Sequence, residues 1–161
     1  MYYAVRKRPQ KLLVVDDLMI RARYIEARTY VHATEDKAKV LKALEQIIGN
    51  GNVVEEYLKG YFGNPIIVLT SYKEKEEADQ TFNSLVHRLT QPDRNYLLMD
   101  LENRVDKNGF LYMRFDKQRA YLGKLMISDS DDVIRVTVKF SGSRKEVVEE
   151  LKKLLGTEGG Q

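Results

Sequence analysis

The stretch ENRVDKNGFLYMRFDKQRAYLG, residues 102–123, carries the strongest structural signal in this 161-residue chain. A Lys-Asn-Gly turn leads into residues 109–115, where side chains alternate as they do in a β-strand with one buried face. Leu111 and Met113 are expected to fill the core. Asp106 and Asp116 are expected to cap local backbone or to orient nearby arginines. We therefore predict a strand that is followed by a basic loop.

Arginine and lysine are dense in this strand and loop, which bring together Arg104, Arg114, Lys117, Arg119 and Lys124 along the chain. Tyrosine and phenylalanine are interleaved with these cations. Cations bind phosphate and an exposed tyrosine stacks on a base, and single-stranded or irregular RNA offers both partners. A plain structural surface is the alternative, because cations of charge-rich proteins often face water or pair with nearby carboxylates.

Strand and helix patterns extend outward from this stretch in both directions. Strand composition marks residues 12–15, 20–31, 53–62 and 66–72, and a hairpin is predicted between residues 124–128 and 133–140. Helices are predicted at 34–48 with Thr34 as N-cap, at 75–89, from Pro92 to before Asp106, and after a capping box of Ser143 and Glu146. Adjacent strands with tight turns favour antiparallel pairing. The predicted fold class is therefore α+β, a two-layer sandwich of a mainly antiparallel sheet with amphipathic helices packed on it.

Length and composition predict a single domain. With 43% hydrophobic residues, residues 1–156 can fill one core, with residues 1–20 as a basic N-terminal arm and residues 157–161 as a flexible tail. The sequence contains no cysteine, which excludes disulfides and thiolate chemistry. No apolar run approaches the length of a membrane span and the start lacks a secretory pattern, so we expect a cytoplasmic protein without a membrane partner.

The sequence contains few candidate catalytic residues. His32 and His87 are too far apart in sequence to form a helical or turn-based metal pair, and each has a structural interpretation at the end of a strand or in a helix. No nucleophile elbow, P-loop or dinucleotide glycine pattern occurs. We predict no enzyme activity, no cofactor and no metal. A metal-assisted phosphodiesterase that uses the acidic residues Asp129, Asp131 and Asp132 is a minor alternative.

Net charge is only +3, so its distribution along the chain matters more than its sum. The excess of cations falls in residues 1–34 and 91–128, and the other segments are slightly acidic. The predicted phosphate-binding surface therefore involves the segment quoted above and, as an independent hypothesis, the basic N-terminal arm.

Four segments resemble an archaeal family described as predicted RNA-binding proteins. They are TYVHATEDKAKVLKAL (29–44), YFGNPIIVL (61–69), the stretch 102–123, and VIRVTVK (133–139). The resemblance spans roughly residues 24–140. Members are also described as a predicted exosome subunit, and the family is similar in fold to a ribosomal protein that binds small ribosomal RNA.

The resemblance implies a non-enzymatic RNA-binding protein, an accessory factor of RNA processing or exosome-mediated decay. RNA and exosome subunits are its implied partners. The residues that match the family motif and that we expect to contact RNA are Arg104, Arg114, Lys117, Gln118, Arg119 and Lys124. A protein interaction module or a homodimer without RNA binding is the alternative.

Overall fold

The computed structural model describes residues 20–60 and 62–156, and it contains one five-stranded sheet in the order β2-β3-β1-β5-β4. Every neighbouring pair of strands is antiparallel. The strands are β1 (Ala22–Val31), β2 (Asn52–Lys59), β3 (Pro65–Glu74), β4 (Phe110–Asp116) and β5 (Val133–Phe140). The helices are α1 (Lys37–Ile48), α2 (Lys75–Arg88), α3 (Gln91–Met99), α4 (Leu101–Arg104), α5 (Lys117–Tyr121) and α6 (Arg144–Gly156). The predicted α+β class is confirmed.

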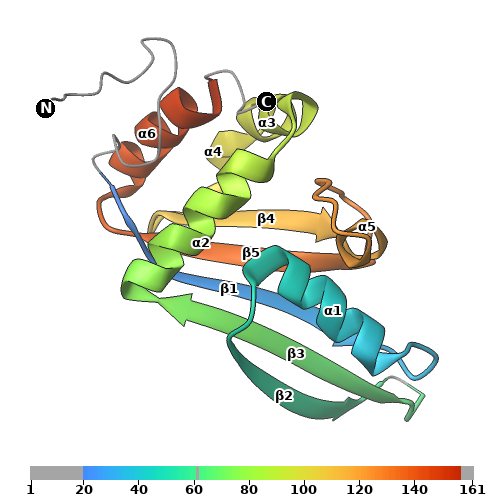
Figure 1. The fold of residues 1–161 in the computed structure, drawn as a ribbon. Coiled ribbons are helices and arrows are strands. Elements are labelled where there is room, and N and C mark those ends of the chain that lie inside the picture. Colours follow the sequence, from blue (N-terminus) through green and yellow to red (C-terminus); the bar gives the residue numbers. More distant parts are fainter. Residues whose placement is uncertain (1–19, 61, 157–161) are drawn as a thin grey trace, which may run out of the picture.

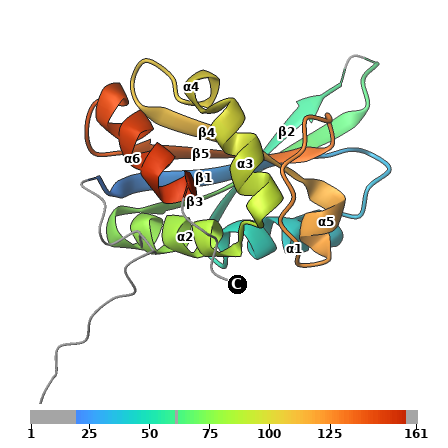
Figure 2. The ribbon, with the colours of Figure 1, turned by 90° about the horizontal axis from the view of Figure 1, so that it is seen from above.

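The helices cover one face of the sheet. Helices α1 and α2 run along that face, and α3, α4 and α6 gather on the side of β4 (Figures 1 and 2). The strands alternate accordingly: on β4 the side chains of Leu111, Met113 and Phe115 are buried, and those of Phe110, Tyr112 and Arg114 point the other way and remain partly or fully exposed. The prediction that Leu111 and Met113 fill the core is confirmed.

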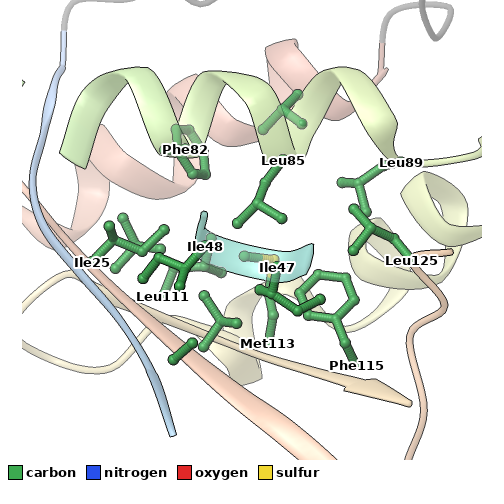
Figure 3. Close-up of a cluster of buried hydrophobic side chains, with 14 of the residues drawn as sticks. Ile25, Ile47, Ile48, Phe82, Leu85, Leu89, Leu111, Met113, Phe115 and Leu125 are labelled. Carbon is green, nitrogen blue, oxygen red and sulfur yellow. The ribbon is translucent and has the colours of Figure 1, made fainter. Parts of the chain in front are cut away.

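One continuous hydrophobic core joins the sheet to the helices. Phe82, Leu85 and Leu89 face Met113 and Phe115 across it (Figure 3). The apolar positions of α2 recur at helical spacing, which is why this helix buries a stripe formed by Ala78, Phe82, Leu85 and Val86. The core therefore fixes the orientation of β1, β3, β4 and β5 and decides which of their side chains lie on the uncovered face.

The start of α1 differs from the prediction. Its N-cap is Asp36, whose carboxylate accepts a hydrogen bond from the backbone N–H of Ala38 at 2.9 Å, and the predicted cap Thr34 precedes it. Glu35 instead turns away from the helix to contact Lys117. The helix predicted after Pro92 is divided at Asp100 into α3 and α4.

Two predictions near the basic loop are wrong. The loop contains a short helix, α5, which begins because the Asp116 carboxylate accepts a hydrogen bond from the backbone N–H of Arg119 at 2.8 Å. Residues 124–128 do not form a hairpin with β5, since both edges of β5 are already paired with β1 and β4. They pass beside β4 instead, where Ile127 forms a single bridge with Phe115.

The last helix matches its prediction. The backbone N–H of Ser143 donates to Glu146 at 2.8 Å, and the N–H of Glu146 donates to the Ser143 hydroxyl at 3.3 Å, which is a capping box. The predicted strand at residues 12–15, the basic arm 1–20 except Ile20, and the tail 157–161 lie outside the described residues. Within the described ranges, no helix is both long and apolar enough to cross a membrane.

Candidate nucleic-acid interface

The face of the sheet opposite α1 and α2, which we call the open face, carries polar and aromatic side chains. On β1 these are Tyr24, Glu26, Arg28 and Tyr30, which alternate with the buried positions of the same strand. All four retain contact with solvent, and Arg28 is exposed. This pattern is typical of an antiparallel sheet that packs against helices on one face and leaves the other face in contact with solvent.

Three arginines form a row across the open face. Arg28 on β1 is paired with Arg135 on β5, and Arg135 is paired with Arg114 on β4. Neighbouring strands lie about 4.8 Å apart, so the three Cα atoms fall within about 10 Å. We call these residues the arginine row.

No carboxylate of residues 20–60 and 62–156 forms an ion pair with this row. Within the described part of the chain, the side chains of Arg28 and Arg135 make no hydrogen bond or ion pair, and Arg114 donates only to the carbonyl oxygen of Ser130, at 2.7 Å. Asp131 lines a small hollow beside Arg28 and Arg135 without an ion pair to either. Like charges directly opposite on neighbouring strands repel each other, so the row favours the approach of an anion.

Tyrosines flank the arginine row. The rings of Tyr24 and Tyr72 stack with their centroids 6.1 Å apart, and Tyr112 is 43% exposed. The Tyr112 hydroxyl donates to Asp106 at 2.9 Å, and this hydrogen bond raises the pKa of the tyrosine. Burial, followed by a hydrogen bond to Glu26, raises the pKa of Tyr24. The hydroxyl groups of Tyr24 and Tyr112 therefore hold these two rings in place and keep them neutral at physiological pH.

Arg104 lies elsewhere, at the end of α4. Its side chain is only 10% exposed, its guanidinium lies 5.4 Å from the centre of the Tyr96 ring, and its nitrogens lie 3.8 Å from Asp100 and 3.9 Å from Asp129. The Tyr96 hydroxyl also donates to Asp129. These contacts link α3, α4 and the loop before β5, so the Arg104 side chain serves to connect them.

Lys117 is a buried cation. Its side chain is 3% exposed, and its Nζ lies 3.0 Å from both Glu35 and Asp132 and donates to the Tyr30 carbonyl at 2.9 Å. Gln118 donates to Asp132 at 3.0 Å. Burial alone would raise the pKa of Asp132, but the hydrogen bonds from Gln118 and Lys117 outweigh it and hold this pKa below its ordinary value. The cluster attaches α5 to the end of β1.

Arg119 and Lys124 are exposed on α5 and just after it, and within the described residues their side chains make no hydrogen bond or ion pair. The structure therefore separates the six residues expected to contact RNA. Arg114 lies on the open face, Arg119 and Lys124 lie at α5, and Arg104, Lys117 and Gln118 already have protein partners. Sequence reasoning missed Arg28 and Arg135. The sequence could have indicated these two residues only by their positions on the polar side of the alternating patterns that became β1 and β5.

The acidic residues considered for a metal site are dispersed. Asp129 contacts Tyr96 and Arg104, Asp132 contacts Lys117, and Asp131 borders the hollow beside the arginine row. Across residues 20–60 and 62–156, no three histidine or acidic side chains are grouped so that they could hold a metal ion. Nothing in this geometry supports the phosphodiesterase alternative.

A family model described as RNA binding matches residues 24–140. This chain belongs to that RNA-binding family. It is 41% identical over 138 residues to the RNA-binding protein PAB1135 of Pyrococcus abyssi, which covers 80% of this chain and 90% of that protein. It is 40% identical over 146 residues to an uncharacterized protein of Methanocaldococcus jannaschii, with coverage of 84% and 97%.

Among solved structures, a DUF54 protein from Methanothermobacter thermautotrophicus has the same fold. Its TM-score is 0.72 at 30% identity, with 83% of this chain and 98% of that chain covered. The family match includes the whole resemblance given in the sequence analysis, so the prediction of an archaeal-type RNA-binding family is confirmed. The exosome association and the likeness to a ribosomal protein stay predictions.

Proposed function

We propose that this chain is a non-enzymatic RNA-binding protein that acts in the cytoplasm as an accessory factor of RNA processing or exosome-mediated decay. Membership of the RNA-binding family supports the RNA partner. The structural observation that carries the proposal is a set of cations that form no ion pair with any described carboxylate, Arg114, Arg119 and Lys124 among them. Arg119 and Lys124 can bind phosphate without displacing a partner among the described residues, and Arg114 has only its hydrogen bond to the Ser130 carbonyl there.

Within this proposal the six motif residues have two roles. Arg114, Arg119 and Lys124 contact phosphates directly. Arg104, Lys117 and Gln118 hold α4, α5 and the loop before β5 in place, because their side chains are engaged in the protein. Contacts to phosphate carry little sequence information, so the protein recognises the shape of RNA more than its sequence.

Filter binding of single-stranded and structured RNA over a salt series tests the proposal. The wild-type chain is expected to bind at low salt and to lose affinity as salt rises, because each phosphate contact releases counterions. Replacing Arg114, Arg119 and Lys124 together by Ala is expected to lower the salt slope by about 2 for single strands. No binding by the wild type at low salt would reject RNA binding.

A matched control removes the same charge elsewhere. Lys145, Lys152 and Lys153 lie on the exposed side of α6, and their replacement by Ala changes the net charge equally. This variant is expected to bind RNA nearly as well as the wild type. Equal losses in both variants would show that net charge alone, and no defined site, governs binding. Reconstitution with purified exosome subunits tests the role in decay separately.

The homodimer or protein interaction module has one observation in its favour. Strand β2 forms an edge of the sheet and is exposed along its whole length. Its exposed apolar residues are Val53, Val54, Tyr57 and Leu58. An open edge strand can pair with a strand of another molecule. Light scattering of the wild type and of Val54→Lys distinguishes this alternative, which requires a dimer that the substitution dissociates.

A further inference from the structure

We propose that the open face of the sheet is a track for single-stranded RNA, in which the arginine row holds phosphates and the adjacent row of side chains meets the bases. This inference rests on the proposed RNA binding. It extends the contact surface from the segment 114–124 to Arg28 and Arg135, which lie on other strands. It also states how the RNA is oriented on the sheet.

The position of the phosphates follows from charge. The arginine row brings three cations onto adjacent strands, and within the described residues Arg28 and Arg135 have no partner. Arg114 has one, the Ser130 carbonyl, and its Nε is buried without a partner. Guanidinium groups bind phosphate with paired N–H donors, so successive phosphates of one RNA strand can accept hydrogen bonds from successive arginines of this row.

The position of the bases follows from the next row of the sheet. There Tyr72 is paired with Glu26, Glu26 with Thr137, and Thr137 with Tyr112. Glu26 repels phosphate and can accept hydrogen bonds from amino groups of bases. The tyrosines present ring surface on which bases stack. If the RNA backbone lies along the arginine row and the bases lie toward Glu26 and Tyr112, the phosphates meet cations and the bases meet an acceptor and an aromatic ring. In the reverse placement the phosphates would meet Glu26, which repels them.

Single-stranded RNA fits this arrangement better than a duplex does. Stacking on a tyrosine requires a base that is not already stacked between its neighbours in a helix. A duplex also presents phosphates on its outside and keeps its bases from a flat protein surface. The exposed Tyr112 ring and the stacked pair of Tyr24 and Tyr72 are therefore suited to splayed bases.

Fluorescence anisotropy of a labelled octauridylate, with a duplex of equal length as comparison, tests the charge part of the proposal. Arg28→Gln combined with Arg135→Gln is expected to weaken binding of the single strand at least tenfold and to lower the salt slope by about 1.4. Lys145→Gln combined with Lys152→Gln changes net charge equally on α6 and is the matched control. Circular dichroism and thermal unfolding confirm that each variant is folded.

Tyr112 tests the stacking part. Tyr112→Ala is expected to weaken binding about 5- to 150-fold with an unchanged salt slope, because a base loses its stacking partner but no phosphate contact is removed. Tyr112→Phe retains the ring and loses only the hydroxyl contact to Asp106, so it is expected to bind nearly as well as the wild type. An equal loss in both variants would overturn stacking on this ring.

The outcomes separate the two proposals. If the wild type binds no RNA, RNA binding itself is rejected, and the track with it. If the wild type binds and the Arg28 and Arg135 variant binds equally well, the track is rejected while RNA binding through Arg119 and Lys124 stands. If the duplex binds as tightly as the single strand and Tyr112→Ala has no effect, the single-stranded track is likewise rejected.

Discussion

Lys117 and Arg135 are both cations, but they differ in burial and in the charges beside them. Lys117 is buried between Glu35 and Asp132 and joins α5 to the end of β1. Arg135 is exposed between two other arginines, and no described carboxylate forms an ion pair with it. Cation density along the sequence therefore does not distinguish a buried, ion-paired lysine from an exposed, unpaired arginine, because the neighbours of each cation in the fold make that difference.

The same contrast exists within a single strand. On β4, Phe115 points into the core and is fully buried, and its neighbour Arg114 points to the open face. The inward side chains of β4 stabilise the fold, and the outward ones are available for a ligand. Substitutions on the two faces can therefore test whether the loss of stability and the loss of RNA binding are separate effects.

The largest expected effect is on the covered face. Phe115→Ala is expected to reduce the free energy of unfolding by about 3–5 kcal/mol, because it removes a buried ring and leaves a cavity. Arg114→Ala, one residue away, is expected to reduce it by less than about 1 kcal/mol, since among the described residues the side chain loses only one hydrogen bond, to a carbonyl. Urea unfolding measures both. Comparable losses would contradict the assignment of the two faces.

The next effect concerns the buried cation. Lys117→Met is expected to reduce the free energy of unfolding by about 2 kcal/mol, because Glu35 and Asp132 lose their cation and the Tyr30 carbonyl loses a donor. This loss of stability is smaller than the loss expected for a fully buried ion pair, because both carboxylates retain contact with water.

Arg119→Ala is the control for this substitution. It lies on the same helix but is exposed, and it is expected to change stability by no more than about 0.5 kcal/mol. For RNA binding we expect the opposite order. Provided that the Lys117→Met variant is folded, Arg119→Ala should weaken RNA binding more than Lys117→Met does. Stability unaffected by Lys117→Met would remove the structural role assigned to Lys117.

A smaller effect depends on pH. Because the folded state holds the pKa of Asp132 below its ordinary value, this carboxylate stabilises the fold above its unfolded pKa of about 3.9, and that contribution is lost as pH falls through the folded pKa. The stability difference between the wild type and Asp132→Asn is therefore expected at pH 7 and should shrink below about pH 4. Urea unfolding at both pH values measures it. A difference independent of pH would contradict the charge contact.

Local patterns made much of the fold predictable. The alternation in residues 109–115 and the capping box at Ser143 depend on neighbours in sequence, and both are confirmed. Helix α5 was missed because five residues that start at the Asp116 cap contain too little apolar periodicity to detect. The hairpin at residues 124–128 was wrong because local strand composition does not show that β1 and β4 already occupy both edges of β5.

The candidate site was less predictable because it depends on register. Arg28 and Arg135 are far apart in the sequence, and only the pairing of β1 with β5 places them side by side. The ion pair of Lys117 likewise involves Glu35, which lies inside the helix predicted at 34–48 but precedes α1 in the structure. The sequence predicts a basic surface, but which of its cations have protein partners depends on the strand order.

The smallest predicted effect has the opposite sign from the others. Arg135→Gln is expected to raise the free energy of unfolding by a few tenths of a kcal/mol, because it removes the central charge of three cations on adjacent strands. The gain should decrease at 1 M salt, where exposed charges are screened within about 3 Å. Lys145→Gln on α6 has no cation paired opposite it on a neighbouring strand and should show no such gain. Urea unfolding at low and high salt measures the difference. A substitution that stabilises the protein and weakens RNA binding would indicate that the arginine row is retained for its ligand, because a row kept for the fold would lose stability instead.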